Sequence, residues 1–348
     1  MQILNSMKIT KYLGIFLLTI ILISCDRDFT VETSPTSDFN LFFKYLKKDY
    51  SYRDAYSFTM EELRLKYLPE IKASDTQQTL ATILVSIKNE LQDPHLYFND
   101  DDIFRLSQVK AYKSDNLEQI SPVFFEVNII RDTSYYVYGT IKSKPNIGYI
   151  YIRAFNDNIG GTDSLGIKDG VKKINDIIKE LNNKDVTGMI IDIRSDAGGS
   201  NYVPRYIAQR FIDKTATYMI EHYPEGSSFI RKEWIVEPAG TGFRTGKIAL
   251  LSNGQTASGG EMFLLAMLQR DNIIHIGSTS AGAAGNIVTK DLSNGWNITM
   301  TNSRTEFPDG KQYFKVGITP SIVVKNDNSY GYTQINDKLI EKALDELQ

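Results

Sequence analysis

Residues 247–270 have the sequence KIALLSNGQTASGGEMFLLAMLQR, which is an apolar strand, a turn of small and polar residues, and an apolar helix that follows Ser258. This order presents the Ser258 hydroxyl beside the free N–H groups of a helix start, whose positive partial charge stabilises an oxyanion. A structural interpretation is also open, because Ser258 and Glu261 have the spacing of a capping box, which requires no chemistry. On this segment alone, the capping box is the simpler interpretation.

Strand and helix patterns alternate around this segment. The predicted strands are 123–130, 135–140, 147–152, 188–193, 247–252, 273–277, 296–301 and 322–324. The predicted helices among and after them are 167–181, 258–269 and 335–347. Such alternation is typical of an α/β fold with a largely buried sheet.

Three helical patterns precede the strands. They cover residues 39–50, 59–71 and 76–91. Apolar residues recur in each at three- and four-residue steps, and Thr59 and Thr76 are suited to be N-caps. The last pattern is followed by Pro94, which stops a helix. We therefore predict a small helical subdomain at 38–98 and a β-rich connecting segment at 99–146.

Residues 1–24 have the pattern of a bacterial lipoprotein signal peptide. Two lysines precede an apolar run at 12–23, which is too short for a comfortable membrane span. The run ends Leu-Ile-Ser-Cys at Cys25, and this resembles the bacterial lipobox. The resemblance implies cleavage before Cys25, a lipid on its sulfur, and a tether at 25–37. The protein is then expected in the cell envelope, at the periplasmic face or the cell surface. A signal anchor with an incidental cysteine is the alternative.

Composition excludes several classes of protein. The chain has 348 residues and a net charge of −3, so it offers no basic surface to nucleic acid. Its single cysteine permits no disulfide framework. Zinc-protease spacing and cysteine–histidine clusters are absent from the sequence, so we expect no metal and no organic cofactor.

Four segments, taken in order, favour the catalytic interpretation of Ser258 over the capping box. They are DPH at 93–95, GYIYI at 148–152, DIRSDAGG at 192–199 and NGQTASGGE at 253–261. In this order and approximate spacing they resemble the tail-specific serine peptidases, the family of C-terminal-processing and tricorn-type proteases. The resemblance covers about residues 40 to 325. It implies a crotonase-like α/β spiral core at 147–348, with a helical N-terminal region before it.

The resemblance also implies the parts of a catalytic site. Ser258 corresponds to the nucleophile, and the backbone N–H groups of Gly199 and Gly259 correspond to the oxyanion hole. Glycine is suited to these positions because its N–H approaches a substrate carbonyl without obstruction. Gly198 and Gly260 are expected to contact the substrate, which is a peptide or protein, bound by strand addition.

The general base distinguishes two branches of this family. One branch uses a lysine some two dozen residues past the serine, but Ala283 stands there and Lys290 falls in a later β pattern. The tricorn-type branch uses a histidine after the N-terminal helices, which corresponds to His95. An imidazole titrates near neutrality, so it can accept the serine proton and return it to the leaving amine. His275 lies in an apolar run, and His222 is expected in a loop without a motif.

The sequence departs from the tricorn-type pattern near its C-terminal end. Phe314 occupies the position of the glutamate that orients the base, and Ser321 replaces an aspartate of the same signature. Without an acid partner, the tautomer and orientation of the imidazole are less well fixed, which lowers the rate of catalysis. Glu306 or Asp309 is a hypothetical substitute.

Three charged residues precede the paired glycines of the third segment. Asp192, Arg194 and Asp196 follow a strand, so we expect structural hydrogen bonds around Gly198 and Gly199 rather than acid–base work.

Taken together, these features predict a lipid-anchored serine-type endopeptidase that uses a serine nucleophile and a histidine base. Its activity is expected to be weakened by the missing glutamate. Two alternatives stay open at this stage. One is a catalytically impaired relative that binds peptides or other ligands, and the other is an ester hydrolase on the same scaffold.

Overall fold

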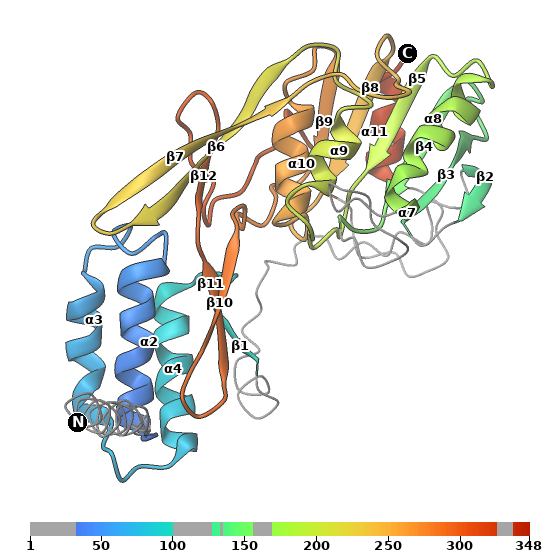
Figure 1. Cartoon of the computed structure of the whole chain (residues 1–348). Helices are drawn as coiled ribbons and strands as arrows, with labels where there is room; N and C mark the ends of the chain where they lie inside the picture. The colour runs from blue at the N-terminus through green and yellow to red at the C-terminus, as the bar shows by residue number, and fades with distance from the viewer. Residues whose placement is uncertain (1–32, 100–126, 133–134, 156–168, 326–336) are drawn as a thin grey trace, which may run out of the picture.

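A seven-stranded mixed sheet and a helical lobe form the two ends of the molecule, with a long β hairpin between them (Figure 1). The computed structural model describes residues 33–99, 127–132, 135–155, 169–325 and 337–348. Within these ranges, no helix combines the length and the apolar character needed to span a bilayer.

The central sheet has the strand order β13-β9-β8-β5-β4-β3-β2. Its strands are β2 (Val127–Asp132), β3 (Tyr136–Ile141), β4 (Ile147–Ile152), β5 (Gly188–Asp192), β8 (Lys247–Ser252), β9 (Ile273–Gly277) and β13 (Ile322–Val323). Neighbours from β4 to β13 run parallel, whereas β3 is antiparallel to both β4 and β2. The inner strands are almost entirely buried, which explains why their sequences are continuous apolar runs.

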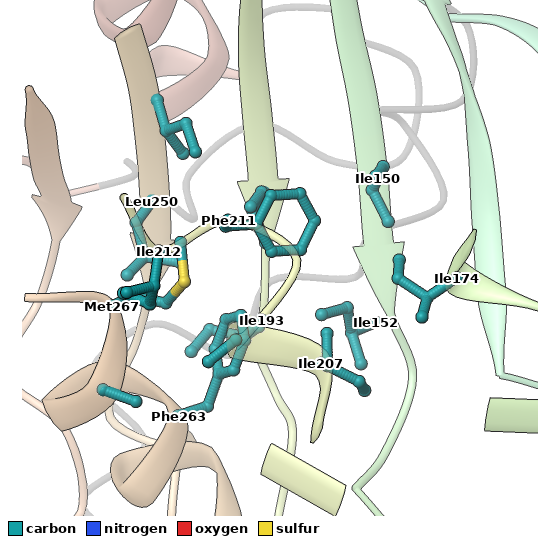
Figure 2. Packing of buried hydrophobic residues seen from close by; sticks show 14 of the residues in the cluster. Ile150, Ile152, Ile174, Ile193, Ile207, Phe211, Ile212, Leu250, Phe263 and Met267 are labelled. Carbon is teal, nitrogen blue, oxygen red and sulfur yellow. The ribbon is translucent and has the colours of Figure 1, made fainter. Parts of the chain in front are cut away.

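Helices cover both faces of this sheet. One face packs against α7 (Asp169–Lys172), α8 (Ile174–Asn182), α9 (Val203–Ala208) and α10 (Gly259–Met267), and the other against α11 (Lys338–Glu346). Figure 2 shows how side chains of the first face converge, among them Ile152 of β4, Ile207 of α9 and Phe263 of α10. All nine residues of α10 are buried, so packing holds this helix along its whole surface.

The helical lobe has its own hydrophobic core. It consists of α2 (Pro35–Asp49), α3 (Met60–Tyr67), a 3-10 turn (Leu68–Glu70) and α4 (Gln77–Leu91). The side chains of Ser34, Thr59 and Thr76 accept backbone hydrogen bonds as N-caps, two of which the sequence predicted.

Strands from distant parts of the chain close the lobe. A small sheet has the order β1-β11-β10, formed by β1 (Tyr97–Asn99), β11 (Asn297–Thr301) and β10 (Ile287–Asp291). Its Ile298 and Met300 are buried in the same cluster as the apolar residues of α2 and α4. The lobe is therefore completed by the C-terminal half of the chain.

A third sheet links the lobe to the central sheet. It has the order β12-β6-β7, formed by β12 (Arg304–Glu306), β6 (Ala216–Glu225) and β7 (Ser228–Val236). The tip of the β6–β7 hairpin reaches the lobe, where the Arg53 guanidinium donates to the Gly226 and Ser228 carbonyls at 2.8 and 3.3 Å (Figure 1).

The observed elements confirm the α/β fold and the helical N-terminal subdomain, with differences in detail. Helix α2 begins at Pro35, so it replaces the last residues of the predicted tether at 25–37. Helix α4 ends at Leu91, and the left-handed backbone of its C-cap Gln92 stops it before Pro94 is reached. The helix predicted at 167–181 is divided into α7 and α8.

Two further differences concern the middle of the chain. Within the connecting segment predicted at 99–146, the described strands β2 and β3 extend the central sheet, and residues 100–126 lie outside the described residues. The hairpin β6–β7 and helix α9 carry no pattern that the sequence analysis identified, since β7 is exposed along most of its length and α9 is only six residues long.

A buried ion-pair network joins the central sheet to α11. The Arg194 guanidinium is fully buried, and it donates to both Asp192 oxygens and to Asp337, the N-cap of α11. This agrees with the structural role predicted for Asp192 and Arg194.

We expect Arg194→Met to lower the free energy of unfolding by about 3–5 kcal/mol, because it leaves two carboxylates without their cation. Urea denaturation measures this change. The control is Arg231→Met, since the Arg231–Glu233 pair is half-exposed and solvent screening leaves it little effect on stability. Equal losses in both variants would contradict the proposed importance of the buried network.

Candidate active site

The candidate site lies where the parallel neighbours β5 and β8 end side by side. The turn after β5 and the turn after β8 are joined by hydrogen bonds. Thr256 Oγ1 donates to the Ile193 carbonyl at 3.0 Å, and the Ala257 N–H donates to the Asp196 carbonyl at 3.0 Å. The Ser195 N–H donates to Asn253 Oδ1 at 2.9 Å. These bonds fix two segments that are far apart in sequence against each other.

The paired glycines after β5 face the start of α10. A Cβ built on Gly198 would lie 2.7 Å from both the Gly259 nitrogen and the Ser258 Cβ, so no side chain fits there. A Cβ on Gly259 would lie 3.1 Å from the Gly199 nitrogen. The structure therefore brings together Ser258, Gly198, Gly199 and Gly259, as the sequence predicted.

Two backbone N–H groups beside Ser258 are free to act as donors. In the described part of the chain, neither the Gly199 N–H nor the Gly259 N–H has a hydrogen-bond acceptor. Gly259 is the first residue of α10, so its N–H lies at the positive end of the helix dipole. Gly199 is exposed, whereas Gly198 is buried.

Ser258 has a strained backbone and an uncommitted hydroxyl. Its φ of 49° and ψ of −114° are unfavourable for a residue with a side chain. Its side chain accepts no hydrogen bond from α10, so the predicted capping box is only half formed. A serine on a sharp strand-to-helix turn exposes its Oγ in this way.

Glu261 supplies the other half of the capping box. Its fully buried carboxylate accepts hydrogen bonds from the Ser258 N–H, from Ser280 Oγ at 2.6 Å, and from the Gly282 and Ala283 N–H groups at 2.7 Å. Burial raises the pKa of this carboxyl, and the hydrogen bonds oppose the shift. Glu261 therefore anchors the 280–283 loop beside the site.

Asp196 holds the turn that carries the paired glycines. Its Oδ1 accepts the Gly198 N–H at 2.7 Å, and burial raises the pKa of this carboxyl well above its usual range. A Cβ on the buried Gly260 would lie 3.2 Å from the Asp196 carbonyl oxygen. Packing therefore explains glycine at 198 and 260, and their predicted contact with substrate stays a prediction.

The clamp on the far side of this turn was missed by sequence analysis. Phe155 follows β4, and its backbone N–H donates to the Gly198 carbonyl at 3.1 Å while its carbonyl accepts the Ser200 N–H at 2.7 Å. Its buried ring packs on Phe263 of α10, with centroids 5.0 Å apart. Nothing in the local sequence marks Phe155, because its importance comes from the two segments that it joins.

His95 lies in the turn after α4, at the edge of the helical lobe. Its residue is 9% exposed, and burial lowers the pKa of the imidazole while the Asp93 carboxylate acts in the opposite direction. Among the residues that the structure describes, no hydrogen bond joins His95 to Ser258. The structure thus places Ser258 beside Gly199 and Gly259 and holds the predicted base, His95, on a different element.

Two contacts show how the lobe approaches the site. The Lys315 N–H donates to the Gly282 carbonyl at 2.8 Å, in the loop held by Glu261, and the Lys315 Nζ is 3.5 Å from the Tyr56 hydroxyl of the lobe. The Tyr52 phenol lies within electrostatic range of both Asp93 and Glu261, and both carboxylates raise its pKa, after burial as the main cause. The turn of His95 and the start of α10 therefore flank a shared region.

The two positions considered for a lysine base, 283 and 290, have other partners. The Ala283 N–H binds Glu261, and the Lys290 ammonium pairs with Asp49 of the lobe at 3.3 Å. In the described ranges, no group of three His, Cys, Asp or Glu side chains is arranged to hold a metal ion.

The hypothetical substitutes for the missing glutamate are engaged elsewhere. Phe314, at the glutamate position, stacks on Tyr52 with ring centroids 3.5 Å apart. Glu306 Oε1 lies 3.1 Å from the His222 imidazole, and Asp309 pairs with Lys311 at 2.8 Å.

The other two histidines have structural surroundings. His222 lies in strand β6, where a loop was expected. His275 is buried as predicted, its Nε2 is 2.7 Å from Ser252 Oγ, and burial lowers its pKa to about 4.

Comparisons with known proteins point to one family. The pattern of Peptidase family S41 matches residues 146–324. The carboxy-terminal processing protease CtpA of Bacillus subtilis is 27% identical over 186 residues, covering 53% of this chain and 36% of that protein. The chloroplastic carboxyl-terminal-processing peptidase 2 of Arabidopsis thaliana is 25% identical over 183 residues, covering 52% of this chain and 32% of that protein. The chain thus spans about a third of the length of these curated relatives.

A solved structure confirms the fold. The crystal structure of a candidate peptidase from Parabacteroides merdae superposes with a TM-score of 0.76 and covers 90% of this chain and 97% of that one. The sequence identity is 18%, so this likeness concerns the fold alone.

The strain at Ser258 has a measurable consequence. Glycine adopts positive φ without strain, so we expect Ser258→Gly to be more stable than Ser258→Ala by about 1 kcal/mol or more. Denaturation midpoints measure the difference. At Ser86, inside α4, the order should be reversed by about 1 kcal/mol. If the glycine variant were less stable than the alanine variant at Ser258 as well as at Ser86, the backbone of Ser258 would not be strained.

Proposed function

Because the chain belongs to peptidase family S41, we propose that it is a serine-type endopeptidase in which Ser258 is the nucleophile and His95 the general base. The observation that supports this most directly is the strained Ser258, whose hydroxyl is not used as a helix cap. Two N–H groups without acceptors in the described chain lie beside it. A structural serine at a helix start would be expected to cap the helix instead.

The proposed reaction follows from these positions. Ser258 Oγ attacks the carbonyl carbon of a peptide bond, and its proton passes to the His95 imidazole. The Gly199 and Gly259 N–H groups stabilise the oxyanion that forms. The imidazolium returns the proton to the leaving amine, and an acyl-enzyme remains on Ser258. Water, deprotonated by the same imidazole, then hydrolyses this ester.

The base has to approach the nucleophile for this reaction. Lys315 links the two parts, because its Nζ lies 3.5 Å from the Tyr56 hydroxyl of the lobe and its N–H donates to the Gly282 carbonyl beside α10. Burial lowers the pKa of the imidazole and so favours its neutral form, which is the form that accepts a proton.

A catalytically weak, peptide-binding relative is the second candidate. Its support is specific: Phe314 replaces the orienting glutamate, and its ring is packed against Tyr52. Binding without turnover would then be the main activity of the protein.

Labelling with a fluorophosphonate distinguishes the two candidates. We expect the wild-type protein to react at Ser258 and Ser258→Ala to remain unlabelled. We expect His95→Ala to react at least about 100-fold more slowly than the wild type. A panel of peptides and small esters, followed by mass spectrometry, then identifies the bond that is cleaved.

His222→Ala is the matched control, because it removes an imidazole that pairs with Glu306. It should label like the wild type. A wild-type protein that does not label would favour the binding protein, and a slow His222→Ala variant with a normal His95→Ala variant would assign the base to His222.

The N-terminal segment suggests where the protein acts. We propose that Cys25, which lies outside the described residues, carries a lipid that anchors the protein to a membrane of the cell envelope. About ten residues separate it from α2, which begins at Pro35.

Expression in a bacterium fed an alkyne fatty acid tests this anchor. The wild-type chain should incorporate the label and sediment with membranes, whereas Cys25→Ser should not incorporate it. Label retained in Cys25→Ser, or membrane association without any label, would favour the signal anchor instead.

A further inference from the structure

Asp93 lies two residues before His95, in the turn that follows α4. Its Oδ1 accepts the His95 backbone N–H at 2.8 Å. Its two oxygens also accept the hydroxyl of Thr301, at the end of β11, at 2.9 and 2.7 Å. Pro94 stands between the two residues and has a fixed φ. The carboxylate therefore holds the His95 segment against β11 in one geometry.

The Asp93 carboxylate also acts electrostatically on the His95 imidazole. Asp93 is only 2% exposed, and it is the charged group that opposes the effect of burial on His95. Glu306 and Asp309 are paired with other residues.

The groups around Asp93 come from each element packed against it. Its charge acts on Tyr50, Tyr52, Tyr56, Lys88, His95 and Lys315. Tyr50, at the end of α2, hydrogen-bonds the carboxylate. Lys88 of α4 and Lys315 of the loop after β12 are the cations within its range. The Lys315 Nζ is 3.5 Å from the Tyr56 hydroxyl, so a polar cluster leads from the surface to Asp93.

We propose that Asp93 positions His95 and stabilises its imidazolium form, in place of the carboxylate that is missing at residue 314. The inference rests on the proposed function, in which His95 takes the proton of Ser258. A positive charge then appears where burial disfavours it, and a nearby carboxylate offsets that cost. Asp93 acts through the turn and through its field, so it is a positioning residue rather than a group that touches substrate.

Asp93→Asn separates the charge from the turn. The amide oxygen still accepts the His95 N–H, but the negative charge is lost. We expect NMR titration of the three histidines to show a lower pKa for His95 in this variant than in the wild type. The matched control is Asp49→Asn, which removes a carboxylate of the same lobe that pairs with Lys290 and should leave the His95 pKa unchanged.

Kinetics provide a second measurement. We expect kcat to fall about tenfold or more with KM little changed, because the charge supports proton transfer and not binding. A base with a lower pKa stays neutral to lower pH, so the acid limb of the pH–rate profile should move to lower pH in Asp93→Asn.

Asp93→Ser is a second neutral variant, since a serine hydroxyl can also accept a main-chain N–H two residues on. An unchanged His95 pKa in either folded variant would overturn the proposal, even where stability falls. The titration needs no turnover, so it is independent of the fluorophosphonate result. A shifted His95 pKa in a protein that does not label would show that Asp93 acts on the imidazole but would reject the peptidase, so the two failures are distinguishable.

Discussion

The backbone contact between the turns after β5 and β8 is the constraint on which the candidate site depends. The glycine at 198 lies against both the Ser258 Cβ and the Gly259 nitrogen, at distances that exclude any side chain. Hydrogen bonds from Thr256 and Ala257 to the other turn maintain this contact. Because the contact is made by backbone, the two N–H donors are placed by the fold itself and not by adaptable side chains. Preorganised donors of this kind are the main electrostatic device of acyl transfer.

Packing and buried polar bonds stabilise the strained serine. Ser258 adopts a conformation that costs about 1–3 kcal/mol, and such strain persists only where the surroundings determine it. Helix α10 is buried on every side, and Glu261 binds both the Ser258 N–H and the 280–283 loop. On the opposite face of the sheet, Arg194 joins the end of β5 to α11. Strain at one residue is thereby offset by burial of a whole helix.

The helical lobe belongs to the site through the C-terminal half of the chain. Strands β10 and β11 complete its core, and the Thr301 hydroxyl at the end of β11 binds Asp93. The same stretch then returns through β12 toward Lys315, whose N–H binds Gly282. One continuous segment thus contacts both the turn of His95 and the loop beside α10. Substitution of Phe for an acid at 314 also fits this role, because the ring packs on Tyr52 of the lobe.

Local patterns in the sequence were sufficient for the core strands, most helices and the serine turn. Apolar runs, N-caps at Thr59 and Thr76, and small residues before α10 act over a few neighbouring residues, so they can be recognised without coordinates. The motif also singled out Gly199 and Gly259, which the fold places beside Ser258. The exposed hairpin β6–β7 and the clamp at Phe155 were missed, because an exposed strand lacks an apolar pattern and the clamp joins segments distant in sequence.

What the sequence by itself determined is the α/β fold, the helical lobe and the identity of the candidate nucleophile. Only the tertiary structure decided that the Ser258 hydroxyl does not cap α10 and that Asp93 holds the His95 turn. It also decided that Glu306 and Asp309 pair with other residues. The physical reason is that hydrogen bonds and charges select partners by distance in space, and the chain brings residues 93 and 301 together only when it has folded.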